Sequence, residues 1–440
     1  MHKIPQDLGA ERAVLGAILI NPDSLDRVAE DGLLPDDFSQ PSHRLLFDCF
    51  VTLAREGKAV DLVTVSGWLE SGGKLESVGG FQYLTELSGS VPSVAHLQQY
   101  ISVVREKALM RRLLTVTHTI SEEIYTGGGS ADENLEQAES AIFALRDSRE
   151  NNRMVPIGDV VSEVYDVLKA RAESPSDVTG IPTGFRDLDA LLTGLQPTDL
   201  VILAARPSMG KTAFALNLVS HAALRDSASV ALFSLEMSKD QLATRMLTSE
   251  ARISGTRMRT GHLMDDDWQP LLHATDTLNK AKVFIDDTPA MTVGAIRAKC
   301  RRLKATEGLN LVVVDYLQLM RGEGREQSRE QEISAISRGL KGLAKEMGLP
   351  VVALSQLNRG VEQRADKRPL MSDLRESGAI EQDADVIMFL YRDEVYNQSP
   401  ENQGLAEVLV RKHRNGSIGE VHLAWRGEFA RFENLERNYN

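Results

Sequence analysis

The chain has 440 residues, of which 42% are hydrophobic and 26% charged, and its formal net charge is −13. Such a composition is typical of a globular protein with two or three domains. No apolar run approaches the roughly 20 residues of a membrane helix, and the N-terminus has no hydrophobic signal region. Two cysteines, Cys49 and Cys300, are too few for a zinc site or a disulfide framework, so we expect buried thiols in a cytoplasmic protein without a membrane partner.

The acidic charge is concentrated in the first third of the chain. Residues 1–150 carry 23 acidic and 13 basic side chains, a net of −10, which leaves 40 acidic and 37 basic side chains, or −3, for the rest. This N-terminal acidity suits contact with a basic partner. It does not exclude nucleic-acid binding elsewhere, because a local basic channel decides that property.

Two all-α segments are predicted at the N-terminus, and neither contains a catalytic constellation. Residues 1–101 show apolar residues at helical spacing, interrupted by Gly or Pro clusters, and are expected to form a compact helical domain. Residues 102–150 are predicted to form a helical hairpin. Its first arm ends near Tyr125, and its second begins with a capping box between Ser130 and Glu133.

A linker with a short amphipathic helix is predicted at residues 151–178. Apolar residues recur there at intervals of three and four, at positions 157, 160, 161, 164 and 168. A helix with such a stripe has to bury it. The sequence leaves open whether it docks on its own domain or on a neighbouring subunit.

An α/β domain is predicted for residues 179–440. Short β-branched runs alternate with helical stretches, which indicates a mostly parallel sheet that is buried on both faces. The last two runs flank Asn415-Gly416, a hairpin signal, so an antiparallel edge is expected. The predicted strands are 200–204, 229–235, 283–286, 311–315, 350–355, 386–391, 406–411 and 420–425.

Residues 205–212 (ARPSMGKT) follow the first of these strands and precede a helix. This context is typical of a phosphate-binding loop, in which backbone N–H groups and a helix N-terminus hold phosphates. Lys211 is expected to reach the β- and γ-phosphates, and Thr212 to hold Mg²⁺. Ala205 replaces the usual first glycine of the motif.

Two acids at strand ends suit catalysis. Asp315 ends a buried strand and is predicted to organise Mg²⁺, the alternative being a helix cap. The residue after Asp315 is Tyr316 and not an acid, so the catalytic base cannot be the residue that follows Asp315. Glu236 ends the strand after the loop and is the candidate base for the attacking water, although such an acid could also simply begin a helix. Gln356, at another strand end, is predicted to sense the γ-phosphate, the alternative being a plain strand-end cap.

Later polar segments add candidate contacts. Lys412 and Arg414 alternate on the hairpin and could act as arginine-finger-type groups on a neighbour's nucleotide, or could form a solvated tip. Two polar stretches, 322–329 and 364–385, follow strands of the domain and could touch a ligand in a central channel. In the second, Arg375 and Gly378 suit phosphate contact and close backbone approach.

Several motifs then occur together and in order: ARPSMGKT (205–212), FSLEM (233–237), VDYLQL (314–319), SQL (355–357), DLRESG (373–378) and KHRNG (412–416), with DLVTV (61–65) in the N-terminal region. With them the chain resembles the bacterial replicative DNA helicases of the DnaB family over essentially its whole length. The resemblance implies a RecA-like P-loop NTPase domain after an all-α N-terminal domain with a helical hairpin.

The resemblance also implies a ring hexamer that hydrolyses ATP with Mg²⁺ and moves 5′ to 3′ on single-stranded DNA, with a primase and a helicase loader as partners at the nucleoid. ATP is expected to be held between subunits, with Lys412 and Arg414 coming from the adjacent one. The other implied contacts are Ser208, Gly210, Lys211, Thr212, Ala213, Arg245 and Gln356 for nucleotide, and Arg375, Glu376 and Gly378 for DNA.

Three other functions share some of these features. A RecA-type recombinase shares the ATPase core, but it does not account for the acidic helical N-terminus and the tethered linker helix. A primase–helicase fusion needs a zinc module that two distant cysteines cannot form. A non-enzymatic loading factor does not need Glu236, Gln356 and Arg414 together. A DNA helicase is therefore the predicted function.

Overall fold

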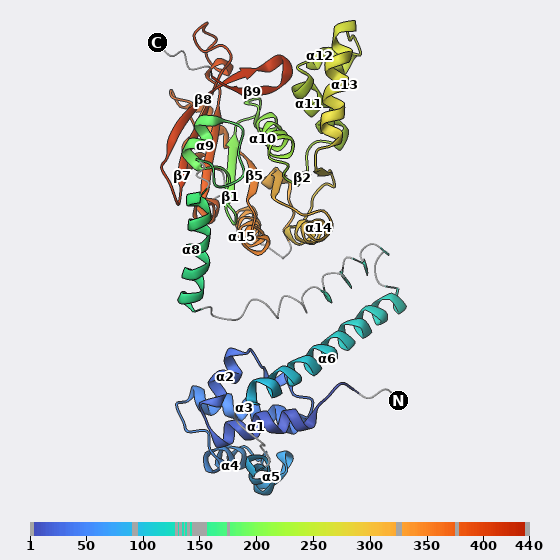
Figure 1. Ribbon diagram of the computed structural model, residues 1–440, viewed down its shortest axis with the longest axis vertical. Coiled ribbons are helices and arrows are strands. Elements are labelled where there is room, and N and C mark those ends of the chain that lie inside the picture. The colour runs from blue at the N-terminus through green and yellow to red at the C-terminus, as the bar shows by residue number, and fades with distance from the viewer. Residues whose placement is uncertain are drawn as a thin grey trace. The chain divides into compact units, whose positions relative to one another are not determined.

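The computed structural model describes residues 4–89, 96–127, parts of 131–142, 156–173, 177–322, 328–374 and 378–435. The chain divides into two compact units, residues 1–169 and 170–440 (Figure 1). Most of the predicted second hairpin arm, including its capping box, lies outside the described residues, as do residues 323–327.

The N-terminal unit is helical, as predicted. Its helices are α1 (Leu8–Ile20), α2 (Ser24–Glu30), α3 (Pro41–Arg55), α4 (Leu62–Ser71), α5 (Gly80–Gly89) and α6 (Leu97–Tyr125). Side-chain caps begin two of them: Asp7 accepts from the Ala10 amide and Asp61 from the Thr64 amide. The core of this unit is built around Phe38, Phe47 and Phe50.

Helix α6 runs without a break through the predicted boundary between residues 101 and 102. Its first turns bury Leu97, Ile101 and Val104 in the N-terminal core, whereas Leu114 and Tyr125 farther along are exposed. The proposed division at this point is therefore internal to one helix.

Helix α8 (Ile157–Glu173) forms where the amphipathic linker helix is predicted. The apolar side chains of its stripe are exposed, with exposed fractions of 75% for Ile157, 51% for Val164 and 55% for Leu168. The stripe is thus available for contact with another surface.

The C-terminal unit contains a nine-stranded sheet in the order β3-β2-β4-β5-β1-β6-β7-β8-β9. Strands β1 to β6 pair in parallel, and β6 to β9 pair antiparallel, so the predicted mixed sheet is confirmed. The strands are β1 (Leu200–Ala205), β2 (Val230–Ser234), β3 (Val283–Asp286), β4 (Leu311–Asp315), β5 (Val351–Gln356), β6 (Val386–Tyr391), β7 (Leu405–His413), β8 (Gly419–Arg426) and β9 (Arg431–Asn434). The sequence patterning does not predict β9, a four-residue strand with two charged side chains.

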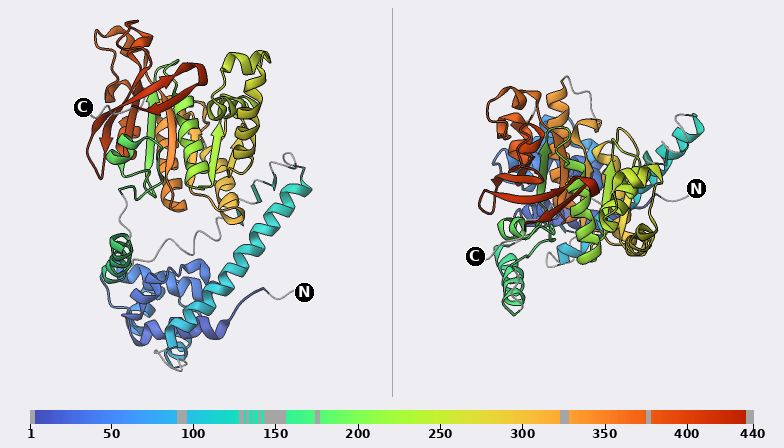
Figure 2. Two further views of the ribbon diagram at one scale, coloured as in Figure 1. Left: turned by 45° about the horizontal axis from the view of Figure 1, so that its top comes forward. Right: turned by 90° about the horizontal axis from the view of Figure 1, so that it is seen from above.

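Helices pack on both faces of this sheet (Figure 2). One core layer includes Leu188, Phe214 and Leu242, and the other includes Ile296, Leu340 and Ile380. The helices are α9 (Arg186–Leu192), α10 (Lys211–Arg225), α11 (Lys239–Ala251), α12 (Gly255–Thr260), α13 (Trp268–Asn279), α14 (Val293–Thr306), α15 (Arg329–Met347) and α16 (Gly378–Asp383). Both faces are covered, and the central strands are accordingly apolar up to the polar residues at the carboxyl ends of β2, β4 and β5.

Both cysteines are buried, as predicted, and burial raises the pKa of each thiol to about 12. Within the residues that the structure describes, no helix combines the length and the apolar character that crossing a membrane requires.

Candidate active site

The loop between β1 and α10 has the backbone of a phosphate cradle. Ser208 and Gly210 both adopt left-handed conformations, with φ of 68° and 94°. A Cβ on Gly210 would lie 3.0 Å from Cζ of Phe432, so a side chain there meets both backbone strain and a packed ring. The loop then opens into α10, whose N-terminal amides are suited to binding an anion.

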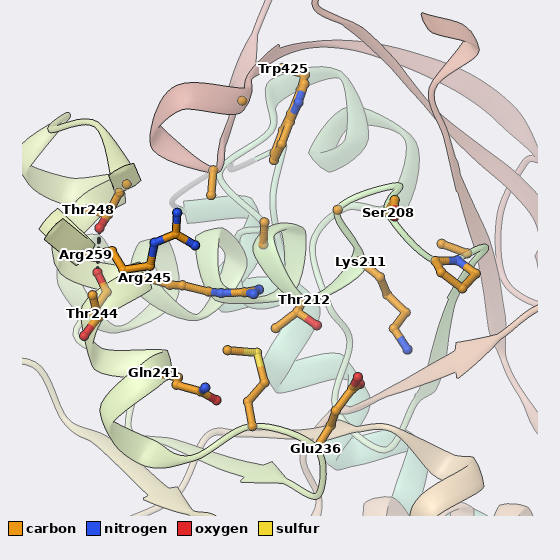
Figure 3. Close-up of a pocket in the computed structure, with 18 of the residues that line it drawn as sticks. Ser208, Lys211, Thr212, Glu236, Gln241, Thr244, Arg245, Thr248, Arg259 and Trp425 are labelled. Atoms are coloured by element: carbon orange, nitrogen blue, oxygen red, sulfur yellow. Dashed lines mark hydrogen bonds between the residues drawn. The ribbon is translucent and has the colours of Figure 1, made fainter. Parts of the chain in front are cut away.

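Sheet topology brings the predicted strand-end residues to one edge. Ala205 pairs with Gln356 across β1 and β5, and Ser234 pairs with Asp315 across β2 and β4. Because these strands are parallel, their carboxyl ends meet at this edge. A pocket of about 1010 Å³ opens there, and its lining includes Ser208, Gly210, Lys211, Thr212, Ala213, Glu236, Arg245 and Gln356 (Figure 3).

Asp315 is a buried acidic residue beside this pocket. Its carboxylate is 2% exposed, accepts a hydrogen bond from Thr212 Oγ1 at 2.7 Å, and lies 3.6 Å from Lys211 Nζ. Its second oxygen, Oδ1, is the atom that faces Lys211, and it makes no closer hydrogen bond in the described part of the chain. One hydroxyl and one under-satisfied carboxylate suit Mg²⁺, which commonly takes few protein ligands and completes its shell with phosphates and water.

Lys211 is enclosed between acidic groups and an aromatic ring. Burial lowers the pKa of Lys211, and the charges of Asp315 and Glu236 oppose part of that shift. The ammonium also lies 4.3 Å from the ring centroid of Tyr316. From the sequence, Tyr316 could only be excluded as a catalytic base. In the structure its ring forms one wall of the site.

Glu236 is exposed and follows β2 at the floor of the pocket. Figure 3 shows its carboxylate pointing into the pocket on the Lys211 side. A carboxylate with this solvent access can accept a proton from water or hold a water in place.

Gln318 joins two strand ends of the site and was not predicted from the sequence. Its amide donates to Ser355 Oγ at 2.9 Å, and its carbonyl accepts from the backbone N–H of Gln356 at 3.2 Å. The feature of the sequence that could have indicated Gln318 is its position three residues after Asp315. Gln356 itself lines the pocket. A movement of Gln356 can therefore be transmitted through Gln318 to the segment that follows β4.

Lys412 and Arg414 are not among the described residues that line the pocket. Both contact the end of α16: Lys412 Nζ donates to the carbonyl of Glu381, and Arg414 donates to that of Gln382. Arg414 also lies 3.6 Å from Asp385, and its side chain is 47% exposed. Lys412 and Arg414 were expected to point the same way because they occupy alternate positions. Their contacts with the same segment, the end of α16, agree with that expectation.

The predicted DNA contacts are only partly described. Arg375 and Glu376 lie outside the described residues, and Gly378 is the exposed first residue of α16. Other pocket-lining residues were missed because no motif marks them. They include Gln241, Arg259 and Trp425 (Figure 3).

Comparison with known proteins covers both units. The family model described as DnaB-like helicase N terminal domain matches residues 3–106, and that described as DnaB-like helicase C terminal domain matches residues 180–434. Replicative DNA helicase DnaC of Bacillus subtilis (strain 168) and replicative DNA helicase DnaB of Geobacillus stearothermophilus are each 46% identical over 437 residues. Each alignment covers 99% of this chain and 96% of the relative.

A solved structure agrees with this assignment. A DnaB-like replicative helicase, whose structure was described with its interactions with primase, is 36% identical, with a TM-score of 0.79 over 98% of this chain and 100% of that one. The all-α unit, the RecA-like domain with its P-loop edge and the full-length likeness together show that the chain belongs to the DnaB family of ATP-dependent replicative DNA helicases.

Proposed function

We propose that the protein works as a homo-hexameric ring that couples ATP hydrolysis to 5′-to-3′ movement on single-stranded DNA and so unwinds duplex at a replication fork. The observation that carries the proposal is the split of the site: P-loop and Glu236 share one pocket above Asp315, whereas Arg414 contacts the segment at the end of α16. Arg206, Arg245 and Arg259 line this pocket, but Lys412 and Arg414 of the same chain are not among its described lining residues. A neighbouring subunit supplies the finger cation.

In the complete site, the described residues divide the work of phosphoryl transfer. Thr212 and Asp315 hold Mg²⁺, which neutralises phosphate charge when bound. Ser208, Gly210 and Ala213 enclose the phosphates, Lys211 pairs with the outer ones, and Arg245 reaches in from α11. Glu236 orients water for attack, and Gln356 senses the outermost phosphate. Lys412 and Arg414 stabilise developing charge from the adjacent subunit.

The linker helix connects neighbouring subunits in this proposal. A ring is closed by head-to-tail contacts, in which two different surfaces meet. In the C-terminal unit, α9 packs against β8 near one sheet edge. At the opposite edge, β3 and α14 border a groove of about 260 Å³ lined by Phe284, Leu303 and Phe233. The exposed stripe of α8 suits that groove on a second copy.

DNA and protein partners occupy other surfaces. Arg375, Glu376 and Gly378 contact the DNA backbone in the central channel, Arg375 by charge. The acidic N-terminal helical unit recruits primase, which is supported by the primase interactions described for the structural relative. A helicase loader places the ring on DNA, and the assembly works in the cytoplasm at the nucleoid. We retain the domain limits 1–101, 102–150, 151–178 and 179–440 as proposals.

Forked duplexes test the motor directly. Forks with a single-stranded 5′ tail, a 3′ tail or both are incubated with ATP and Mg²⁺, and strand displacement and phosphate release are measured. We expect displacement to require a 5′ tail and ATP, and to be abolished by Glu236→Gln. Glu401→Gln, the same change on an exposed turn, serves as the control. ATP hydrolysis without displacement on any fork, with the loader supplied, would favour a recombinase-like filament.

A further inference from the structure

Residues 357–374 form a strap that connects the end of β5 with the proposed DNA contacts, which begin at Arg375. The two ends of the strap lie side by side, because Leu357 and Leu374 form an antiparallel bridge. Both leucines are buried, with exposed fractions of 2% and 6%. The first residue of the strap is therefore tied to the residue that immediately precedes the DNA contacts.

The phosphate-binding loop holds the strap at this same place. The N–H of Leu357 donates to the carbonyl of Ala205 at 3.1 Å, and Nη1 of Arg206 donates to the carbonyl of Leu357 at 2.7 Å. Ala205 and Arg206 are the first two residues of the phosphate-binding motif. Both backbone polar groups of Leu357 are thus bonded to the loop, and one strand pairing separates them from the DNA contacts.

Arg206 makes a second contact with the strap, through charge. Its Nε and Nη2 lie 2.9 Å and 2.8 Å from Oε1 of Glu362, and the two side chains are 10% and 44% exposed. Hydrogen bonds between ionised partners are about twice as strong as neutral ones. Arg206 also lines the nucleotide pocket. A phosphate in the pocket and Glu362 therefore attract the same guanidinium, so pocket occupancy changes how firmly the strap is held.

Two further arginines keep the strap folded. Arg364 donates to Asp373 from two nitrogens, at 2.9 Å and 2.7 Å. Arg368 donates to Glu407 of β7 from two nitrogens, at 2.8 Å and 2.7 Å. Paired contacts of this kind fix orientation as well as distance. A displacement at the contact with Arg206 therefore changes the position of the far end of the strap and is not absorbed within it.

We infer that Arg206 is a positioning residue that couples nucleotide in the pocket to the DNA contacts of the same subunit, and that Glu362 is its partner in this role. The inference deepens the proposed function and rests on it, because it takes residues 375–378 as DNA contacts. It is separate from the connection made by Gln318, which leads from Gln356 to the segment after β4.

Coupling of two ligands is measured as a ratio of dissociation constants. The Kd of the full-length hexamer for a fluorescent oligo-dT strand is determined without nucleotide and with saturating Mg-AMP-PNP, under conditions in which light scattering shows hexamers in both states. By linkage, the Kd for Mg-AMP-PNP changes by the same factor when the strand is added. A side chain that only supports the fold changes both values for the strand alike and leaves their ratio unchanged.

Replacement of Glu362 by Ala is the principal test. We expect the ratio to move toward one by about 2- to 30-fold, the range found for substitutions along a coupling network. The Kd for Mg-AMP-PNP without DNA should stay unchanged, because Glu362 is outside the pocket lining. Arg206→Lys keeps the charge but cannot donate to Glu362 and Leu357 from several nitrogens, so its ratio should be intermediate.

A matched control and a double variant complete the design. Asp366→Ala removes another acid of the strap, which is 71% exposed and lies 3.9 Å from Arg368, and should leave the ratio unchanged. Arg206→Met should lower the ratio less in the Glu362→Ala background than alone, because the ion pair is already lost there.

The outcomes separate this inference from the proposed function. An unchanged ratio in Glu362→Ala, or an equal loss in Asp366→Ala, overturns the role of Arg206 and Glu362 but leaves the motor proposal intact. Failure of the unaltered protein to bind the strand, or a ratio of one in that protein, overturns both.

Discussion

Replacement of Arg414 by Ala tests whether the site is completed by a neighbouring subunit. An arginine finger contributes about 10³–10⁵ in rate, so DNA-stimulated ATP turnover is expected to fall by at least about 10³. The fold should barely change. Arg414 is 47% exposed, and Asp385 keeps hydrogen bonds from the Leu200 amide at 2.8 Å and from Lys341 at 2.5 Å. Loss of so exposed a pair costs below about 1 kcal/mol.

Mixed rings then distinguish a finger in trans from one in cis. Arg414→Ala subunits keep an intact P-loop half, and Lys211→Ala subunits keep an intact finger. In rings assembled from equal amounts of both, about a quarter of the interfaces pair the two intact halves. We expect phosphate release to reappear in the mixture although each protein alone is inactive. Subunits are exchanged by co-expression with two tags and purified through both.

A second mixture supplies the control for subunit exchange. Lys211→Ala and Glu236→Gln both impair the pocket half of the site, so no interface between them contains a complete pocket. This mixture should stay inactive. A mixture of Arg414→Ala and Lys211→Ala that also stays inactive, despite confirmed mixed rings, would refute the trans assignment.

Other consequences can be measured separately. Asp315→Asn should raise the Mg²⁺ concentration for half-maximal turnover about 10–100-fold, and an unchanged Mg²⁺ titration would exclude Asp315 as an organiser of the metal. Burial lowers the pKa of Lys211 below the ordinary lysine value of 10.5, so this ammonium loses its charge at a lower pH than an exposed lysine does. The Kd for MgADP should therefore rise as the pH approaches 10.5. A Kd that stays constant up to that pH would contradict a role for the charge of Lys211 in binding. Leu168→Asp should dissociate the hexamer in light scattering with helix content unchanged, because Leu168 is 55% exposed; an intact ring refutes α8 docking. Burial raises the pKa of Cys300 to about 12, so alkylation of the native protein at pH 8 should be slow until denaturant is added, and rapid labelling would contradict its burial.

Local sequence patterns predicted most of the elements of this protein. β-branched runs marked β1 to β8, and amphipathic spacing marked α8, because side-chain periodicity and backbone preference act over a few residues. The P-loop was recognisable for the same reason, since its glycine and the Lys-Thr pair that follows it are adjacent in sequence. The strand β9 escaped prediction, because four residues with two charges are too short a pattern.

Tertiary structure alone decided which distant residues meet. The order of strands places Asp315 beside Ser234 and Gln356 beside Ala205, and no pattern within either segment specifies that neighbour. The contacts of Arg392 with Ser208 and Trp425 join three positions from separate parts of the chain. The sequence by itself therefore determined the elements and the chemistry that each one carries, because those depend on local interactions. Packing of the sheet decided how these groups share one pocket, because strand pairing is a property of the whole domain.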